Sequence, residues 1–169
     1  MKFNSKNIYL IGMMGCGKST VGKLLAKILG VHFSDIDSEI EINKRQTVTE
    51  IFVNEGETHF RNLETEALKS PKNSIVACGG GIVLRNENRT FLRSNGTVIL
   101  LTASIDELFR RVSNLNSRPL LNKTNDAKET LKHLWEERKN QYNNIANFTI
   151  ITDGLTPQQI CNKIIDKVK

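Results

Sequence analysis

The segment GMMGCGKS at residues 12–19 carries the residue types that bind phosphate groups. Its glycines let backbone N–H groups turn toward phosphate oxygens, and Lys18 adds a positive charge beside them. The Ser19 hydroxyl is a suitable ligand for Mg²⁺. An apolar run precedes the segment and an amphipathic helical pattern follows it, as this motif requires. The loop is therefore predicted to bind a nucleoside triphosphate through Gly12, Gly15, Cys16, Gly17, Lys18, Ser19 and Thr20.

Two acidic residues, Asp35 and Asp37, follow the short apolar run at residues 31–33. Residues two apart on an extended chain point to the same side, so at the carboxyl end of a strand both would face the phosphate loop. One carboxylate would then hold Mg²⁺ through water, and the other would orient a substrate hydroxyl. The structural alternative is a helix cap at Asp37 or Ser38.

Two arginines lie on apolar helical stripes. Arg61 and Glu64 are three residues apart and can pair, because a buried acid needs a partner; an ordinary surface ion pair is the alternative. Arg138 falls on the apolar helix face that begins at Leu131. There its charged end either extends to the edge of that face and reaches solvent or binds an anion in a pocket.

The glycines at 79–81 follow an apolar strand and suit the close approach of a ligand to the backbone, although a tight turn would also use them.

Residues 113–126 have no periodic pattern and contain four asparagines and a proline. Loops of this length are usually functional, so we expect a lid here. Arg118 lies in the middle of it and would close on the transferring phosphoryl group. A solvated loop arginine is the alternative.

The rest of the chain supplies the elements that position these residues. Continuous apolar runs predict strands at residues 8–11, 74–78, 97–102 and 148–152. Unbroken apolar strands that alternate with helical patterns favour an α/β fold with a parallel sheet covered on both faces. Residues 37–68 contain only helical patterns and are expected to form an insertion between strands.

Composition limits the classes of protein that remain. A chain of 169 residues is the size of one domain, and 38% hydrophobic with 25% charged residues indicates a soluble globular protein. No apolar run approaches a membrane span, and we see no signal peptide, so a cytoplasmic protein is expected. Three scattered cysteines exclude a disulfide scaffold. The net charge of +6 suits anionic partners, but aromatics at 6% and the absence of a basic run disfavour an RNA-associated protein.

Together these motifs resemble those of shikimate kinases, in the family's order and spacing and over nearly the whole chain. The matching segments are GMMGCGKST at 12–20, FSDID at 33–37, GETHFRNLE at 56–64, CGGGIV at 78–83, RPLL at 118–121 and ERKNQY at 137–142. The resemblance implies a P-loop fold like that of nucleoside-monophosphate kinases, with a five-stranded parallel sheet, a helical substrate-binding insertion and a lid. It also implies ATP-dependent phosphorylation of the 3-hydroxyl of shikimate, with Mg²⁺, on the route to chorismate and the aromatic amino acids.

The resemblance assigns the acceptor side of the reaction. It implies that Asp37 contacts the reacting hydroxyl and that Arg61 and Arg138 bind the shikimate carboxylate. Glu64 would position Arg61. The backbone of Gly79, Gly80 and Gly81 would complete the shikimate site.

The nucleotide side follows in the same way. The resemblance implies that Lys18 and Ser19 serve the phosphates and Mg²⁺, with Asp35 supporting the metal through water. Lys18, Asp37 and Arg118 would be the catalytic residues. Arg111 and Pro157 would enclose the adenine, although Arg110 is adjacent and only the spacing selects Arg111.

The departures from the family pattern are small side chains, Cys16 in the phosphate loop and Cys78 before the glycines.

We expect shikimate and ATP as the only partners, no nucleic acid or membrane, and a monomer. The alternative within the same fold is another small-metabolite kinase such as a gluconate kinase, which an assay of the acceptor would distinguish.

Overall fold

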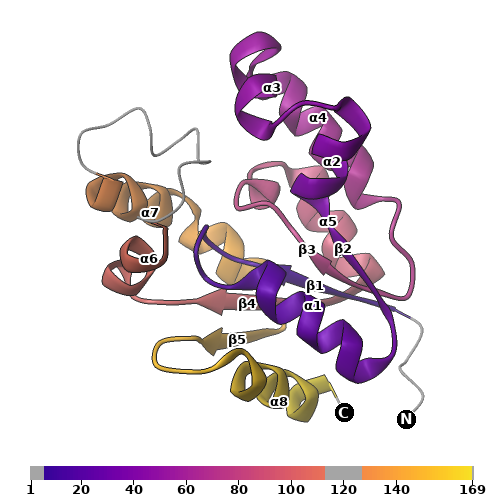
Figure 1. Ribbon diagram of the computed structural model, residues 1–169, viewed down its shortest axis with the longest axis vertical. Helices are drawn as coiled ribbons and strands as arrows, with labels where there is room; N and C mark the ends of the chain where they lie inside the picture. The colour runs from indigo at the N-terminus through magenta and orange to yellow at the C-terminus, as the bar shows by residue number, and fades with distance from the viewer. Residues whose placement is uncertain (1–5, 113–126, 169) are drawn as a thin grey trace.

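The computed structural model describes residues 6–112 and 127–168, so the predicted lid at 113–126 lies outside it. Its centre is a five-stranded parallel sheet with the strand order β2-β3-β1-β4-β5 (Figure 1). The strands are β1 (Asn7–Ile11), β2 (His32–Asp35), β3 (Ser74–Ala77), β4 (Gly96–Thr102) and β5 (Phe148–Ile151). The predicted α/β fold and its parallel sheet are confirmed.

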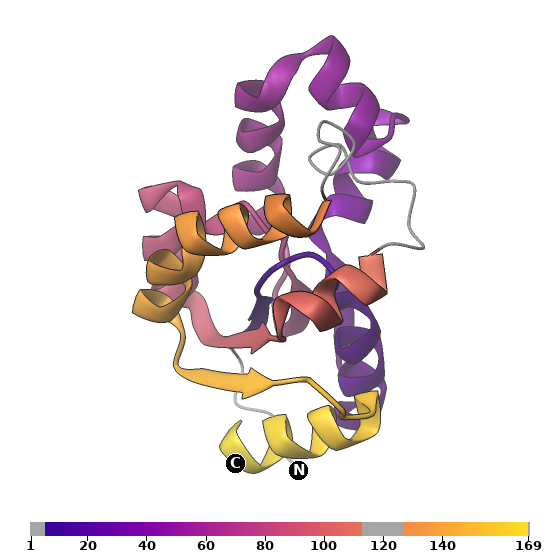
Figure 2. The same cartoon turned by 90° about the vertical axis from the view of Figure 1, so that its left-hand side faces the viewer.

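Helices cover both faces of this sheet. Helices α1 (Lys18–Leu29) and α8 (Pro157–Val168) lie on one face, and α5 (Asn86–Asn95) and α7 (Ala127–Ile145) lie on the other (Figures 1 and 2). Gly30 ends α1 in the left-handed conformation with φ 67°, as its glycine predicts. Helix α6 (Ile105–Val112) lies against the phosphate loop, where a Cβ on Gly15 would contact the Val112 side chain.

Three helices occupy the stretch between β2 and β3, namely α2 (Ile36–Lys44), α3 (Val48–Asn54) and α4 (Gly56–Leu68). They stand together above the sheet in both ribbon views (Figures 1 and 2). Thr47 begins α3 with a capping box, in which its hydroxyl accepts from the Glu50 N–H and the Glu50 carboxylate accepts from the Thr47 N–H. That these helices form a substrate-binding insertion stays a prediction.

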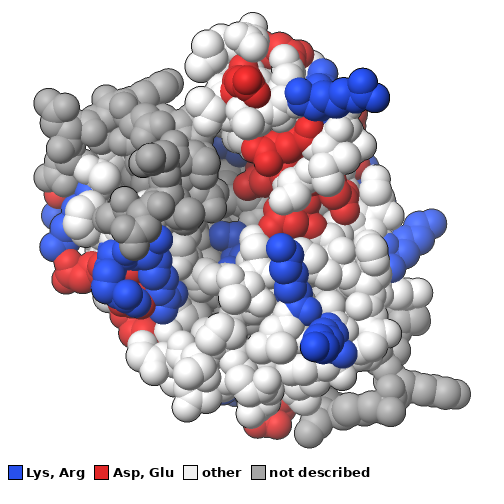
Figure 3. All heavy atoms as spheres, in the orientation of Figure 1, with Lys and Arg blue, Asp and Glu red and all other residues white. Residues whose placement is uncertain are grey.

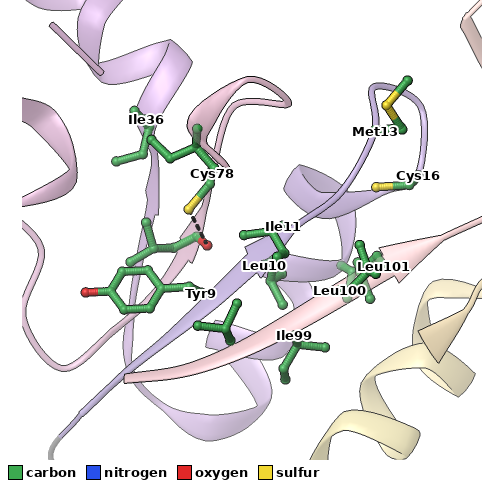
Figure 4. Close-up of a cluster of buried hydrophobic side chains, with 14 of the residues drawn as sticks. Tyr9, Leu10, Ile11, Met13, Cys16, Ile36, Cys78, Ile99, Leu100 and Leu101 are labelled. Carbon is green, nitrogen blue, oxygen red and sulfur yellow. Dashed lines mark hydrogen bonds between the residues drawn. The ribbon is translucent and has the colours of Figure 1, made fainter. Parts of the chain in front are cut away.

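The core is built around β1, which is buried along its whole length. Leu10, Ile11 and the β4 residues Ile99, Leu100 and Leu101 pack together there (Figure 4). Since β1 lies between β3 and β4, the segments that follow β1, β2 and β3 emerge side by side at one edge of the sheet. This edge gathers the predicted site residues. Within the two described segments, no helix has the length and apolar character that crossing a membrane requires.

Candidate active site

A cavity of about 750 Å³ opens at the carboxyl ends of the strands. Nearly all of the described site residues that the sequence predicted line it. They are Gly15, Cys16, Gly17, Lys18, Ser19, Thr20, Asp35, Asp37, Arg61, Glu64, Gly79, Gly80, Gly81, Arg111, Arg138 and Pro157. Gly12 is not part of the lining: it adopts φ 135°, and a Cβ there would collide with the Leu101 carbonyl. Arg118 lies outside the described residues.

The phosphate loop delivers its lysine at the start of a helix. Gly17 adopts φ 96° and caps α1, so Lys18 is the first helical residue and lies at the positive end of the helix dipole. Lys18 Nζ donates to the carbonyl oxygens of Gly12 and Met13, both at 2.9 Å. The Cys16 side chain is buried and points toward the core beside Leu101 (Figure 4). Any contact of Cys16 with a nucleotide is therefore left to its backbone.

Ser19 and Asp35 join the phosphate loop to β2. The Ser19 hydroxyl donates to Asp35 Oδ2 at 2.5 Å. A hydroxyl and a carboxylate side by side present only oxygen atoms, which is the donor set that Mg²⁺ prefers, so the two residues fit the predicted metal site.

The local structure around the two aspartates differs from the sequence-based prediction. Helix α2 begins at Ile36, so Asp37 lies in its first turn and the extended chain ends at Asp35. Asp35 is the cap of that helix, because its side chain accepts from the Ser38 N–H at 3.3 Å. The expectation that both aspartates lie on an extended chain was wrong, and so was the alternative of a cap at Asp37 or Ser38. Both carboxylates still line the cavity.

Asp37 and Glu64 meet at Gly79. A Cβ on Gly79 would collide with one carboxylate oxygen of each residue, so the backbone and the two acids lie in direct contact. Glu64 is fully buried, and its Oε1 has no hydrogen-bond partner among the described residues. Burial raises the pKa of Glu64 to about 7, although the Arg61 guanidinium opposes the shift.

Arg61 is held by two carboxylates of its own helix. Its Nη1 donates to Glu64 Oε2 at 2.5 Å, which confirms the predicted pair. Its Nε and Nη2 donate to Glu57 Oε1 at 3.2 and 2.9 Å, a contact that the sequence analysis missed. These bonds use three of the five N–H donors of a guanidinium. In the described part of the chain, one N–H on each terminal nitrogen therefore remains for a carboxylate ligand.

The faces of the Arg61 guanidinium are also in contact. Its Cζ lies 5.4 Å from the centroid of the Phe60 ring and 5.8 Å from that of Phe52, distances at which a cation and an aromatic face attract. A Cβ on Gly81 would collide with the same guanidinium. The apolar spacing of Phe60 was visible in the sequence, but nothing there indicated that its ring faces an arginine.

Arg138 comes to the cavity from α7. It is buried, with 3% of the residue exposed, which confirms that it lies on the inward face of its helix. Its Nη1 lies about 3.7 Å from the position that a Cβ on Gly80 would occupy, and its Nε has no hydrogen-bond partner within the described segments. A buried guanidinium with unused donors is suited to bind an anion.

Arg111 forms part of the opposite end of the cavity. Its Nε donates to Glu107 at 2.7 Å, and its Nη1 donates to Thr152 Oγ1 at 3.0 Å and to the Gly15 carbonyl at 3.3 Å. Arg110 also binds Glu107, but 71% of its side chain is exposed. Hydrogen bonds from Arg110 and Arg111 lower the pKa of Glu107 to about 2. Arg111 is thus the more firmly anchored of the two candidates.

Comparison with known proteins assigns the chain to a family. A family model described as shikimate kinase matches residues 14–169. The chain belongs to the shikimate kinase family. A shikimate kinase of Marinomonas sp. is 43% identical to it over 168 residues, covering 96% of this chain and 92% of the relative. The family resemblance of the sequence motifs is confirmed.

Solved structures agree with this membership. Shikimate kinase from Acinetobacter baumannii in complex with shikimate matches with a TM-score of 0.93 and 37% identity, covering 96% of this chain and 92% of that one. A gluconokinase from Sinorhizobium meliloti matches with a TM-score of 0.56 and 14% identity, covering 96% of this chain and 91% of the other. The second similarity shows a shared fold alone, so the gluconate kinase alternative gains no support from it.

Proposed function

We propose that this member of the shikimate kinase family transfers the γ-phosphate of ATP to the 3-hydroxyl of shikimate. One observation carries the proposal: the phosphate loop with Lys18 and the two buried arginines, Arg61 and Arg138, line the same cavity. A triphosphate and a small carboxylate bound in one cavity are the two substrates that this reaction needs. Phosphoryl transfer depends mainly on positioning and charge stabilisation, which these groups supply.

On the nucleotide side, Lys18 and the backbone N–H groups of the loop hold the β- and γ-phosphates. Ser19 would hold Mg²⁺ directly and Asp35 would hold it through water, and the bound ion would supply positive charge beside the phosphates. Arg111 stacks on the adenine from α6, and Pro157 covers its other side from the first residue of α8.

On the acceptor side, Arg61 and Arg138 bind the shikimate carboxylate through their unused N–H groups. Asp37 accepts a hydrogen bond from the 3-hydroxyl and orients its oxygen toward the γ-phosphate. Glu64 fixes Arg61, and the backbone at 79–81 forms the wall on which shikimate lies.

The remaining assignments belong to the same proposal. Residues 113–126 act as the lid, and Arg118 reaches the transferring phosphoryl group from it. We infer a cytoplasmic monomer that binds neither nucleic acid nor membrane. In support, Figure 3 shows acidic side chains gathered over α2–α4, while the described lysines and arginines on that face lie in separate places, unlike the basic stripe typical of nucleic-acid binding.

The test is a coupled assay of ADP release with ATP and Mg²⁺. Shikimate is expected to stimulate release strongly, whereas gluconate and nucleoside monophosphates leave it at the background rate. Identification of the phosphorylated product by NMR checks that the 3-hydroxyl is the acceptor. Stimulation by gluconate and not by shikimate would contradict the proposal.

A further inference from the structure

Tyr142 does not line the cavity, but its hydroxyl contacts Gly80, which does, and it is not part of the proposed machinery above. It is fully buried and follows Arg138 by one helical turn, so both side chains leave α7 on the same face. Its ring stacks on Trp135 with 6.2 Å between centroids. An apolar residue would satisfy this packing, so the buried hydroxyl needs another explanation.

The hydroxyl of Tyr142 connects three parts of the site. It donates a short hydrogen bond to the Gly80 carbonyl oxygen. The Arg138 side chain opposes the rise in the pKa of this hydroxyl, so the two groups lie close enough to interact. The hydroxyl also lies 4.0 Å from Met13 Sδ in the phosphate loop. The hydroxyl thus holds the glycine backbone beside which the Arg138 guanidinium lies.

The surroundings of Gly80 agree with this connection. A Cβ on Gly80 would lie 3.7 Å from Arg138 Nη1 and 3.7 Å from the Tyr142 hydroxyl. Burial raises the pKa of Tyr142, so the phenol keeps its proton and stays a donor to Gly80 at neutral pH. Because the hydroxyl holds the Gly80 carbonyl and the Arg138 guanidinium lies beside the same glycine, it fixes the backbone next to that guanidinium.

We propose that Tyr142 is a positioning residue for the shikimate carboxylate: it holds the Gly80 backbone beside the Arg138 guanidinium so that both address one ligand. The inference rests on the proposed function and extends it to a residue that touches no reacting atom. Without the hydroxyl, the Gly80 carbonyl loses a buried partner, and the backbone beside Arg138 gains freedom that shikimate binding must then restrict.

The test compares Tyr142→Phe with Tyr9→Phe. Tyr9 is a matched control because it is also fully buried, and its hydroxyl accepts from Asn7 Nδ2 at 2.9 Å. Its partner Asn7 does not line the cavity, whereas Gly80, the partner of Tyr142, does. The Tyr9 ring also points away from Met13 and Cys16 (Figure 4). Both substitutions delete one hydrogen-bonded buried hydroxyl and are expected to lower the thermal midpoint by similar amounts.

Only Tyr142→Phe is expected to change the binding of the acceptor. In Tyr142→Phe the Kd and KM for shikimate rise about tenfold, the usual effect of one lost hydrogen bond near a charged group, while the KM for ATP stays within about twofold. For the carboxamide analogue of shikimate, the loss is smaller because Arg138 has no carboxylate to align. Equal affinity of Tyr142→Phe, Tyr9→Phe and wild type for shikimate would overturn the inference. Failure of the wild type to bind shikimate would instead overturn the proposed function.

A second measurement needs no variant at residue 142. The chain has two tyrosines, so incorporation of 3-fluorotyrosine gives two ¹⁹F signals, and Tyr9→Phe removes one of them for assignment. Shikimate is expected to shift the Tyr142 signal and leave the Tyr9 signal in place. Saturating shikimate that moves neither signal would contradict the link between Tyr142 and the carboxylate site.

Discussion

Arg61 and Glu64 form an ion pair of 2.5 Å inside the wall of the cavity, with Glu64 fully buried and 9% of the Arg61 side chain exposed. The pair is local in sequence, yet it fixes a charge in a cavity that several elements line. Since the arginine also meets Gly81 and two aromatic rings, its guanidinium has little freedom even without a ligand.

Replacement of Glu64 by Gln should change how stability depends on pH. The pKa of Glu64 rises from 4.5 to about 7 in the folded protein, mainly through burial. The folded protein therefore keeps a proton that the unfolded chain releases between these values, and this stabilisation is present in acid and lost as the pH rises through 7. From pH 5 to pH 8, wild type should lose about 2 kcal/mol relative to Glu64→Gln, measured by urea unfolding. Parallel pH profiles would contradict the raised pKa.

The glycines after β3 should differ in their tolerance of a methyl group. A Cβ on Gly81 collides with Arg61, whereas one on Gly80 meets only ordinary contacts at 3.7 Å. Gly81→Ala is expected to lose about 1–3 kcal/mol of stability and to weaken shikimate binding because Arg61 must move. Gly80→Ala should unfold close to wild type, in the same denaturant titration. A Gly81→Ala protein with wild-type stability and affinity would show that the guanidinium does not rest on this backbone.

Lys18→Met should fold normally and lose most of its transfer activity. Losing one transition-state charge contact costs roughly 3 to 4 kcal/mol, or about two to three orders of magnitude in kcat. Lys23→Met is the control, since Lys23 is exposed on the same helix and does not line the cavity. The measurement is turnover in the coupled assay beside a circular dichroism melt. Near-normal turnover of Lys18→Met would remove the basis for the phosphate-loop assignment.

Arg138 should require a guanidinium and not merely a positive charge. Arg138→Lys keeps the charge but loses the planar fork, so shikimate binding weakens; Arg138→Ala should cost about 1.5 to 3 kcal/mol. ATP binding should barely change in either variant. Arg93→Lys, at an exposed position on α5, is the control. Calorimetric titration with shikimate and with its carboxamide tests the claim, because an equal loss for both ligands upon Arg138→Ala would exclude Arg138 from the carboxylate site.

Features that depend on neighbours in sequence were predictable. The phosphate loop, the end of α1 at Gly30 and the Arg61–Glu64 pair each follow from spacing within a few residues. The placement of Arg138 on an inward face followed from helical periodicity in the same way.

Contacts between distant segments were not predictable from the sequence. The bond from Arg111 to Thr152 joins residues 41 positions apart, and that from Tyr142 to Gly80 joins residues 62 apart. Periodicity identifies the buried face of a helix but not the group on another element that will meet it. The start of α2 at Ile36 was not predicted either. Asp35 is both the last residue of β2 and the cap of α2, so the sequence pattern does not show where the strand ends and the helix begins.

The central place of β1 also has a consequence for how the protein folds. The strand that leads into the phosphate loop pairs with residues 75–77 and 96–100, so its hydrogen-bonding partners are synthesised long after it. A nascent chain that ends before β4 leaves one edge of this apolar strand uncovered, and pairings of such sequence separation form slowly. ATP affinity should accordingly arise late in refolding, in the same kinetic phase as burial of the sheet, and a chain truncated before residue 96 should expose β1 to chaperones.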